Sequence, residues 1–297
     1  MTTSNTFLPN IQVYPAKNFK IAIDNLTRQM FEMCIDGKDE ISLELVESHF
    51  KNIHSSIKIS NLNSLKVKFT EFEYAVFDST ISERIAENEY TTAAILCRHL
   101  GCWHTPSPEI QKAVIHSLDK LACIRIIANL DGTQKFYNSP IGDFEFRGYL
   151  LPSESLSMSI NGQPSILIHF LSKGPVFAIA EMKDQIITCP SELMQAPVRT
   201  TPRTIAINHF LLRRILEIKG SVEISKTNKR VKPLRHTILV DSLYKACGME
   251  HASKFQKQDA RKTADIVLKF FVEKNLIKNF SYETGKGGKI RAINFNF

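Results

Sequence analysis

The clearest pattern of apolar and polar residues lies at the C-terminal end of the chain, over residues 253–297. Ser253 is followed three residues later by Gln256, the reciprocal capping pair of a helix start. Apolar residues then recur at spacings of three and four, which predicts a helix with one buried stripe. Asn275 tolerates the left-handed backbone on which helices often end. The predicted buried stripe comprises Ala260, Ala264, Val267, Leu268 and Phe271.

A hairpin pattern follows this predicted helix. Residues 277–282 favour a strand, and residues 283–289 form a turn rich in glycine and lysine. Ile293, Phe295 and Phe297 then alternate along a closing strand. A helix followed by a strand, a basic loop and a strand is typical of the end of a winged helix. The helix is then the predicted recognition helix, and the loop is the predicted wing.

Two more helices complete this unit, which spans residues 203–297. We expect Thr204 to cap a helix over residues 205–219, and residues 237–247 favour a second helix. The intervening residues 220–235 are predicted to form a basic loop. The residues of this loop that we expect at DNA are Arg230, Lys232 and Arg235.

A second unit, over residues 66–150, has the same predicted order of three helices and a hairpin. Ser107 at the N-cap position and Pro108 at the first helical position give its strongest helix start. Three helices and a hairpin again describe a winged helix. The predicted elements are helices over residues 71–88, over residues 91–100 and from Ser107 onward, a strand over residues 124–130, a turn at residues 131–132 and a returning segment through Tyr137.

Residues 151–202 predict a β-rich bridge and linker between the two units. Asn161-Gly162 favours a tight hairpin between two strand-like runs, and residues 175–182 favour a short helix. Residues 1–65 are predicted to be a helical extension, with helices over residues 18–34 and 41–57, that serves as an accessory arm or partner contact. The predicted fold is therefore α+β, with two winged-helix (helix-turn-helix) domains, a bridge that contains a β-hairpin, and an N-terminal helical extension.

The charge of the chain is concentrated at one end. The 297 residues have a net charge of +8, but residues 196–297 hold 21 lysines and arginines against 8 aspartates and glutamates, a net charge of +13. Residues 1–195 have a net charge of −5, and residues 66–150 have one of −2. A basic end on an acidic body predicts contact with a polyanion. Because that end contains the predicted recognition helix, we expect double-stranded DNA.

Several other classes of protein are disfavoured. No apolar run approaches the roughly 20 residues that span a bilayer, so we expect no membrane partner. The N-terminal residues lack the basic and apolar regions of a secretory signal. The six cysteines form no CxxC pair and are predicted to be reduced thiols of a cytoplasmic protein.

Catalytic and metal-binding motifs are missing from the sequence. The glycines and lysines of residues 285–289 lie between strands and do not open a helix, so they do not form a phosphate-binding loop. HExxH and GxSxG are absent, as are the paired histidines of nicking endonucleases. His99 and His104 flank Cys102 but lack the second half of a metal site. We therefore predict a binding protein, not an enzyme, with no metal or cofactor.

The first two turns of the predicted recognition helix are basic. A helix in the major groove meets base edges that distinguish all four base pairs. Arg261 or Lys262 is expected at guanine and Gln258 at adenine, with the other residues at phosphates. Wing residues are expected at phosphates or in the minor groove. The predicted DNA-binding residues are Lys254, Lys257, Gln258, Arg261 and Lys262 on the helix and Lys286, Lys289 and Arg291 on the wing.

These segments resemble theta-type replication initiators of plasmids and mobile elements. Residues 72–101 and 107–126 resemble the first winged helix of that family. Residues 205–219 and 238–248, with the helix and hairpin that come after them, resemble the second. The resemblance extends over about residues 70–297.

The resemblance implies a protein that binds repeated origin sites, helps to melt the adjacent DNA and recruits host helicase or initiator proteins. It implies that the second winged helix is the main base reader, and that the first contributes to a homodimer and to auxiliary DNA contact. Because the first domain is acidic, it departs from the pattern in which both winged-helix domains recognise DNA bases. The positions that match the family are Lys257, Gln258, Arg261 and Lys262 on the recognition helix and Lys286 and Lys289 on the wing.

Two alternatives remain open from the sequence. A transcriptional regulator on the same scaffold needs one palindrome, whereas an initiator needs several adjacent sites and distorts the DNA. A protein-interaction module would bind DNA weakly and without sequence preference.

Overall fold

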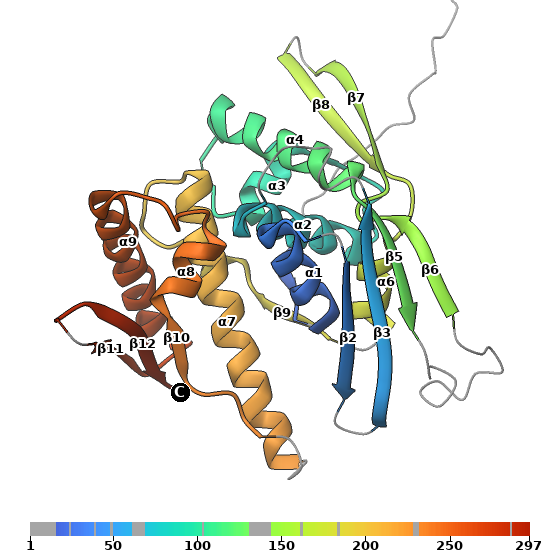
Figure 1. The fold of residues 1–297 in the computed structure, drawn as a ribbon. Coiled ribbons are helices and arrows are strands. Elements are labelled where there is room, and N and C mark those ends of the chain that lie inside the picture. The colour runs from blue at the N-terminus through green and yellow to red at the C-terminus, as the bar shows by residue number, and fades with distance from the viewer. Residues whose placement is uncertain are drawn as a thin grey trace, which may run out of the picture.

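The computed structural model is a mixed α+β fold with small antiparallel sheets over the residues that it describes (Figure 1). These are residues 16–23, 25–38, 40–47, 50–60, 69–102, 104–130, 144–160, 163–182, 185–227, 232–285 and 287–297.

The C-terminal part of the chain consists of helices and a three-stranded antiparallel sheet. Its elements are α7 (Pro202–Thr227), β10 (Thr237–Leu239), α8 (Val240–Ala246), α9 (Lys254–Glu273), β11 (Asn279–Thr284) and β12 (Ile290–Asn296). The strand order is β10-β12-β11, so the last strand lies between the other two. Helix α9 and the hairpin of β11 and β12 lie together at one edge of the molecule (Figure 1).

Helix α9 begins and ends as the sequence predicts. Ser253 N donates to Gln256 Oε1 at 2.9 Å, and Gln256 N donates to Ser253 Oγ at 3.3 Å, which completes the predicted capping pair. Asn275 follows the helix with φ of 58°. The whole predicted stripe of apolar residues is buried, which confirms that one face of α9 packs on the core.

Helix α7 starts earlier and ends later than predicted. Thr201, and not Thr204, caps it, because Thr201 Oγ1 accepts a hydrogen bond from Thr204 N at 3.2 Å. Gly220 lies inside the helix, which continues to Thr227. One glycine costs a helix only about 1 kcal/mol, so it does not end the helix here. Residues 220–227, which were predicted to belong to a loop over residues 220–235, are therefore the last part of α7.

The predicted helix over residues 237–247 is instead a short strand followed by a shorter helix. The three residues of β10 pair with β12, and Ile238 lies opposite Ile293. Thr237 and Ile238 are β-branched, which favours a strand once a partner is present. The helix prediction was wrong for these residues because the partner strand lies far along the chain.

The middle of the chain repeats the order of helix, strand, two helices and hairpin. Ile110 N donates to Ser107 Oγ at 3.4 Å, which confirms the predicted cap. The preceding helix, predicted over residues 91–100, is capped by Thr92 and begins at Ala93. The predicted turn at residues 131–132 and the segment through Tyr137 lie outside the described residues. The elements are α2 (Glu71–Ile85), β4 (Tyr90–Thr92), α3 (Ala93–His99), α4 (Pro108–Cys123), β5 (Arg125–Leu130) and β6 (Phe144–Tyr149).

A β-hairpin and a short helix come next, as the bridge pattern predicts. The hairpin strands pair up to Ile160 opposite Gln163, which leaves two residues for the turn. The last turn of this segment contributes Leu193 and Met194 to the core. The elements are β7 (Ser153–Ile160), β8 (Gln163–Phe170), α6 (Pro175–Met182), β9 (Ile186–Pro190) and the 3-10 turn η2 (Ser191–Met194).

The N-terminal residues do not form the predicted helical extension. The elements are β1 (Asn18–Ala22), α1 (Asn25–Asp36), β2 (Glu40–Glu47) and β3 (Phe50–Ser60). The helix predicted over residues 18–34 begins only at Asn25, and the helix predicted over residues 41–57 is a pair of antiparallel strands. The sequence contains the reason, because Ile41, Leu43 and Leu45 alternate with polar residues at the period of a strand.

Strand pairing builds these N-terminal elements into the rest of the fold. Strand β1 pairs with β9, and the hairpin of β2 and β3 extends the hairpin of β5 and β6 into one sheet of order β2-β3-β5-β6. Strand β4 pairs with β8 and not with its own hairpin. The middle unit therefore shares its strands with neighbouring segments, which distinguishes it from the C-terminal unit.

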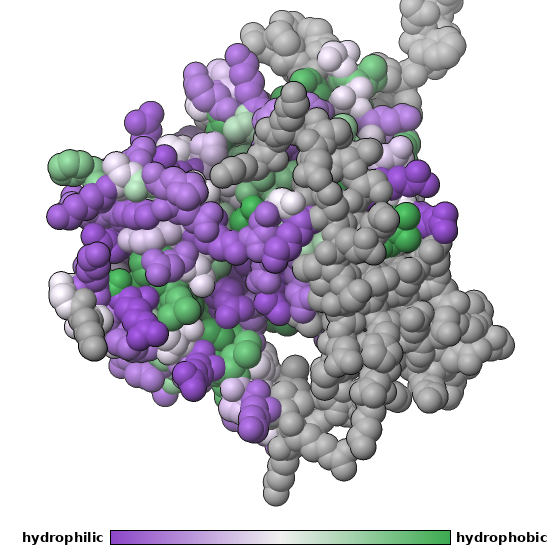
Figure 2. Space-filling model, viewed as in Figure 1, coloured by the Kyte–Doolittle hydropathy of each residue, from purple (hydrophilic) through white to green (hydrophobic). Residues whose placement is uncertain are grey.

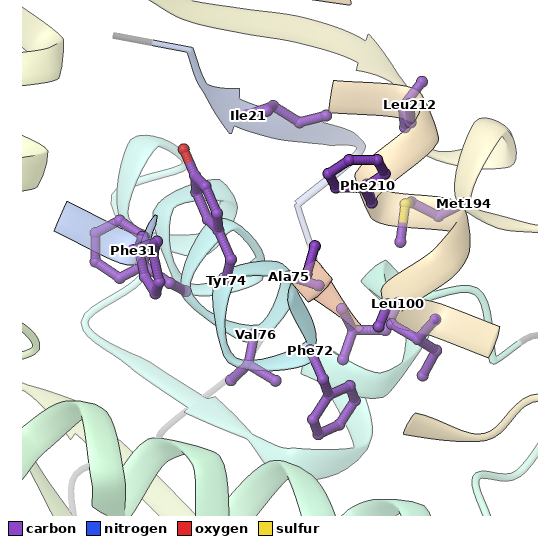
Figure 3. Close-up of a cluster of buried hydrophobic side chains, with 14 of the residues drawn as sticks. Ile21, Phe31, Phe72, Tyr74, Ala75, Val76, Leu100, Met194, Phe210 and Leu212 are labelled. Atoms are coloured by element: carbon purple, nitrogen blue, oxygen red, sulfur yellow. The ribbon is translucent and has the colours of Figure 1, made fainter. Parts of the chain in front are cut away.

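Hydrophilic side chains cover most of the C-terminal unit in the view of Figure 2. Inside, apolar side chains from several elements meet around α2 (Figure 3). Phe31 of α1 stacks on Tyr74 of α2, with ring centres 4.1 Å apart. Leu100 after α3, Met194 of η2 and Phe210 of α7 belong to the same buried cluster. One core thus connects the middle unit to the C-terminal unit.

Helix α2 also holds four buried carboxylates. Burial of a charge is costly unless the charge is paired, and each of these acids has a basic partner from another element. Glu71 binds His209 and Arg213 of α7, Glu73 binds Lys120 of α4, Asp78 binds His209 and the backbone N–H of Ala22, and Glu83 binds His99 of α3.

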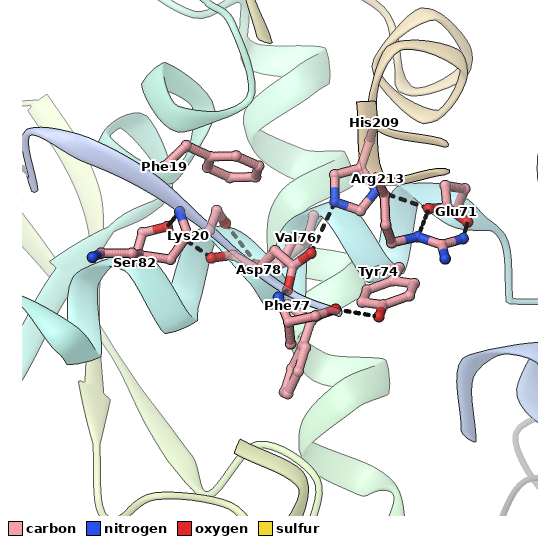
Figure 4. A network of polar contacts seen from close by, with 12 residues as sticks. Phe19, Lys20, Glu71, Tyr74, Val76, Phe77, Asp78, Ser82, His209 and Arg213 are labelled. Atoms are coloured by element: carbon pink, nitrogen blue, oxygen red, sulfur yellow. Dashed lines mark hydrogen bonds and ion pairs between the residues drawn. The ribbon is translucent and has the colours of Figure 1, made fainter. Parts of the chain in front are cut away.

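His209 lies between two of these acids (Figure 4). Its Nδ1 is 2.9 Å from Glu71 Oε1, and its Nε2 is 2.9 Å from Asp78 Oδ2. Burial lowers the pKa of His209, but the hydrogen bonds with the two carboxylates outweigh burial and raise it. Burial raises the pKa of Asp78 to about 6, although His209 opposes that rise. When protonated, the imidazole donates to both acids.

Arg213 completes this contact between α2 and α7. Its Nε and Nη2 donate to the two oxygens of Glu71 at 2.8 and 3.0 Å, and its Nη1 donates to Glu217 at 2.6 Å. The guanidinium carbon also lies 4.7 Å from the ring centre of Tyr74. A bidentate pair of this kind fixes direction as well as distance, so α7 is held in one orientation on α2.

Candidate nucleic-acid interface

The face of α9 opposite its buried stripe carries polar and basic side chains on consecutive turns. Lys254, Gln258 and Lys262 are exposed, and each lies four residues after the one before it. Residues at this spacing share one side of a helix. The side chain of Lys262 lies 3.8 Å from that of Asp259, and both are about 70% exposed, so the pairing is weak. The structure therefore brings three predicted residues together on one outward surface.

Lys257 is directed elsewhere. Its Nζ donates to the backbone oxygen of Glu250 at 2.6 Å and lies 5.4 Å from the ring centre of Tyr244. The Tyr244 hydroxyl in turn donates to the backbone oxygen of Lys257 at 3.3 Å. These contacts attach the start of α9 to α8. The ammonium group of this predicted DNA contact is thus engaged within the protein.

Arg261 is half-buried on α9, and its charge acts on Tyr244 of α8 and Tyr282 of β11. Burial raises the pKa of the Tyr244 and Tyr282 hydroxyls, and the nearby positive charge of Arg261 opposes both rises. The side chain therefore lies at the base of the outward face of α9, beside two phenols, and not at its centre.

The hairpin is fixed to α9 by polar contacts. The Tyr282 hydroxyl donates to Asp265 Oδ1 at 3.3 Å, and Lys269 Nζ lies 2.7 Å from Asp265 Oδ2. Tyr282 and Asp265 belong to β11 and α9, so the contact sets the position of the hairpin relative to the helix.

The turn between β11 and β12 is tight and depends on glycine. Gly285 N donates to Lys289 O at 2.8 Å, and Gly288 N donates to Gly285 O at 3.2 Å. Gly287 and Gly288 have φ of 81° and 70°, a conformation that side chains of L-residues rarely adopt. Of the predicted wing residues, Lys289 and Arg291 are exposed and Lys286 lies outside the described residues.

Two of the remaining predicted residues, Lys232 and Arg235, lie at the other end of the sheet. Lys232 and Arg235 are exposed in the segment before β10, whereas Arg230 lies outside the described residues. Strand β10 begins at Thr237, which pairs with Asn294 near the end of β12. The turn of the hairpin leads into the opposite end of β12. The structure therefore separates this basic segment from the wing.

Phe255 is a surface residue that the sequence prediction missed. Its side chain is 78% exposed on the first turn of α9. It lies three residues before Gln258 and seven before Lys262, which places it on the same outward face. The signal was present in the sequence, because Phe255 is an aromatic residue out of phase with the buried stripe.

His99 of α3 is engaged in a buried contact within the protein. His99 Nε2 is 2.5 Å from Glu83 Oε1, and both side chains are buried. All six cysteines are free thiols. Over the described part of the chain, no group of three or more histidine, cysteine, aspartate or glutamate side chains is placed to hold a metal ion. Of the helices that the structure describes, none is long and apolar enough to cross a membrane.

Comparison with known proteins gives only weak likeness. No family model matches the sequence, and no curated protein matches it. A selenomethionine derivative of domains 2 and 3 of RctB has a TM-score of 0.39 and 12% identity, covering 87% of this chain and 91% of its own. A second structure of RctB domains 2–3 has a TM-score of 0.37 and 12% identity, covering 88% of this chain and 92% of its own. Likeness at this level does not establish a shared function.

Proposed function

We propose that residues 203–297 form a winged-helix domain that binds double-stranded DNA in a sequence-specific manner. The observation that carries the proposal is the outward surface of α9, which presents Lys254, Gln258 and Lys262 on one face beside a basic hairpin turn. The order of α7, β10, α8, α9 and a hairpin, with the strand order β10-β12-β11, supports it because this is the order of a winged helix.

The dimensions and charge of α9 suit the major groove. An α-helix is about 10–12 Å wide with its side chains, and the groove is about 12 Å wide. Gln258 would pair with adenine, Lys262 would donate to guanine, and Lys254 would hold a phosphate. Arg261, at the base of the outward face of α9, would contact the phosphates beside the groove. The net charge of +13 over residues 196–297 attracts the DNA before contact.

The hairpin would act as the wing. Lys289 and Arg291 are exposed beside the turn, where they would contact phosphates or the adjacent minor groove. Lys232 and Arg235 would contact the backbone of flanking DNA, because they lie at the opposite end of the sheet.

We further propose that residues 66–150 form a second winged helix with a role in dimerisation and auxiliary DNA contact. The order of α2, β4, α3, α4, β5 and β6 supports this, as does a net charge of −2, which is unsuited to a main DNA reader. In this proposal the protein acts by binding and has no catalytic activity of its own.

The biological role that we propose is initiation of replication on a plasmid or mobile element. It is supported by the resemblance of residues 70–297 to theta-type initiators together with the DNA-binding surface of α9. Repeated origin sites and host helicase or initiator proteins would be the partners. A transcriptional regulator on the same scaffold would be satisfied by one palindrome.

Selection of bound duplexes from a random library tests the proposal. We expect one motif to bind about a thousandfold or more tightly than random DNA, with an affinity that falls steeply between two salt concentrations. The double variant Gln258→Ala with Lys262→Ala should lose this preference. Lys38→Ala, which removes another exposed lysine far along the chain, is the matched control. Failure of the parent protein to enrich any motif would contradict the proposal.

The arrangement of the motif then separates initiation from regulation. Clusters of adjacent motifs in the source element, with enhanced reactivity of neighbouring thymines to permanganate on binding, are expected of an initiator. A single palindromic motif without such reactivity would indicate a regulator.

A further inference from the structure

Phe255 is the most exposed of the large apolar side chains in the described part of the chain. It is 78% exposed, whereas the other exposed large apolar side chains range from 40% to 52%. Burial of a phenylalanine is strongly favourable in water. An aromatic side chain left this far in solvent is therefore available for contact with a ligand.

The fold does not account for Phe255. The cap of α9 is made by Ser253 and Gln256, and the buried stripe lies on the opposite face of the helix. Among the described residues, no aromatic ring lies against Phe255. Removal of its side chain should therefore leave the fold unchanged.

The surroundings of Phe255 favour nucleic acid over protein as the ligand. The nearest exposed apolar residue on this face, Ile266, is 40% exposed and lies eleven residues on, about 16 Å along the helix. Gln258, Asp259 and Lys262 lie between them. A stable protein interface covers about 800 Å² on each partner, and one isolated ring of about 150–250 Å² does not supply its apolar centre.

We propose that Phe255 contacts the 5-methyl group of a thymine in the major groove, and so makes the protein select an A·T pair at that position. This inference rests on the proposed function of α9. The thymine methyl is the apolar group on the major-groove edges of the bases, and phenylalanine is suited to contact it. The ring shares its face with the polar and basic residues assigned to base edges.

The geometry also predicts where the thymine lies in the site. Phe255 and Gln258 are three residues apart, which is about 4.5 Å along the helix. Successive base pairs are about 3.4 Å apart. The selected thymine should therefore lie within about two base pairs of the adenine that Gln258 reads.

Duplex selection with the parent protein, Phe255→Ala and Phe255→Leu is the first test. The parent and Phe255→Leu should require thymine at one position of the motif, whereas Phe255→Ala should accept other bases there and keep the rest of the motif. Leu171→Ala is the matched control, because Leu171 is 52% exposed but lies beyond β8. Thermal unfolding of all four proteins should be nearly the same.

The second test replaces that thymine with deoxyuridine, which lacks only the methyl group. Loss of one methyl contact is worth about 0.8 kcal/mol, or about a fourfold loss of affinity. The parent should show this loss and Phe255→Ala should show none. If the parent binds its motif specifically and deoxyuridine has no effect at any thymine, the thymine contact is overturned and the proposed function of α9 is not.

Other outcomes are equally decisive. An equal loss of affinity of Phe255→Ala for every sequence, or loss of self-association with unchanged DNA affinity, would overturn the thymine contact. Failure of the parent protein to select any motif would overturn the proposed function and this inference together.

Discussion

Gln258 presents an amide on the outward face of α9, and an amide both donates and accepts hydrogen bonds. An amide of this kind can form two hydrogen bonds with adenine, whose N6 donates and whose N7 accepts. We expect Gln258→Ala to weaken binding to the selected site by about 1–3 kcal/mol and to relax the preference at one base pair. Affinity for random DNA should stay unchanged. Competition binding with single-base variants of the site measures both effects, and an equal loss on every sequence would contradict the assignment.

Lys257 tests whether position along a helix or contact within the protein determines the role of a residue. Its ammonium donates to Glu250 O at 2.6 Å and lies near the Tyr244 ring. We expect Lys257→Ala to lower the free energy of unfolding by about 1 kcal/mol, since one hydrogen bond is lost. The preferred DNA motif should not change. Thermal unfolding and duplex selection check the two parts, and a changed motif would show that Lys257 reads bases.

At the scale of elements, the hairpin should contribute affinity without sequence preference. Lys289 is exposed beside the turn between β11 and β12. If it contacts a phosphate, Lys289→Ala should weaken binding to all sequences alike and should reduce the slope of log affinity against log salt by about one. Lys38→Ala is the control, because Lys38 is exposed after α1 and lies outside the C-terminal unit. An unchanged slope would exclude Lys289 from the interface.

Elements with local signals were predictable from the sequence. Helix α9 carries its cap, its apolar stripe and its terminal Asn275 within one segment, so its limits and its exposed face could be predicted directly. Strands β2 and β3 form a local hairpin, and the alternation of Ile41 with Leu43 and Leu45 was a strand signal that the helix prediction passed over. Strand β10 was mistaken for helix because Ile238 pairs with Ile293, far along the chain. The inward turn of Lys257 was hidden for the same reason, since it depends on tertiary contact with Tyr244.

At the scale of the whole molecule, α2 and α7 make one buried ionic contact between the two main units. Glu71 of α2 binds both His209 and Arg213 of α7, and all three side chains are buried. Separation of the units would expose these charges and would also open the shared apolar core. We therefore expect the described units to unfold together in one transition, and not as independent domains.

This contact should make stability depend on pH. The pKa of His209 is raised above its ordinary value of 6.5, so the folded state retains a proton that the unfolded chain releases. Stabilisation from His209 is then complete below pH 6.5 and is lost as pH rises through the raised pKa. The pKa of Asp78 is raised from 3.8 to about 6, so its contribution to stability is also lost as pH rises between those two values. Glu71, whose pKa is lowered, loses its contribution below about pH 4.5.

We therefore expect the unfolding temperature to be highest in mildly acidic buffer and to fall as pH rises above 6.5. His209→Gln keeps one donor but cannot titrate, so it should lower stability by about 1–3 kcal/mol and flatten the decline above pH 6.5. His116→Gln is the control, because His116 is exposed on α4. Thermal unfolding of the three proteins between pH 5 and 9 measures the slopes. An equal decline in the parent and His209→Gln would mean that the proton on His209 does not couple α7 to α2.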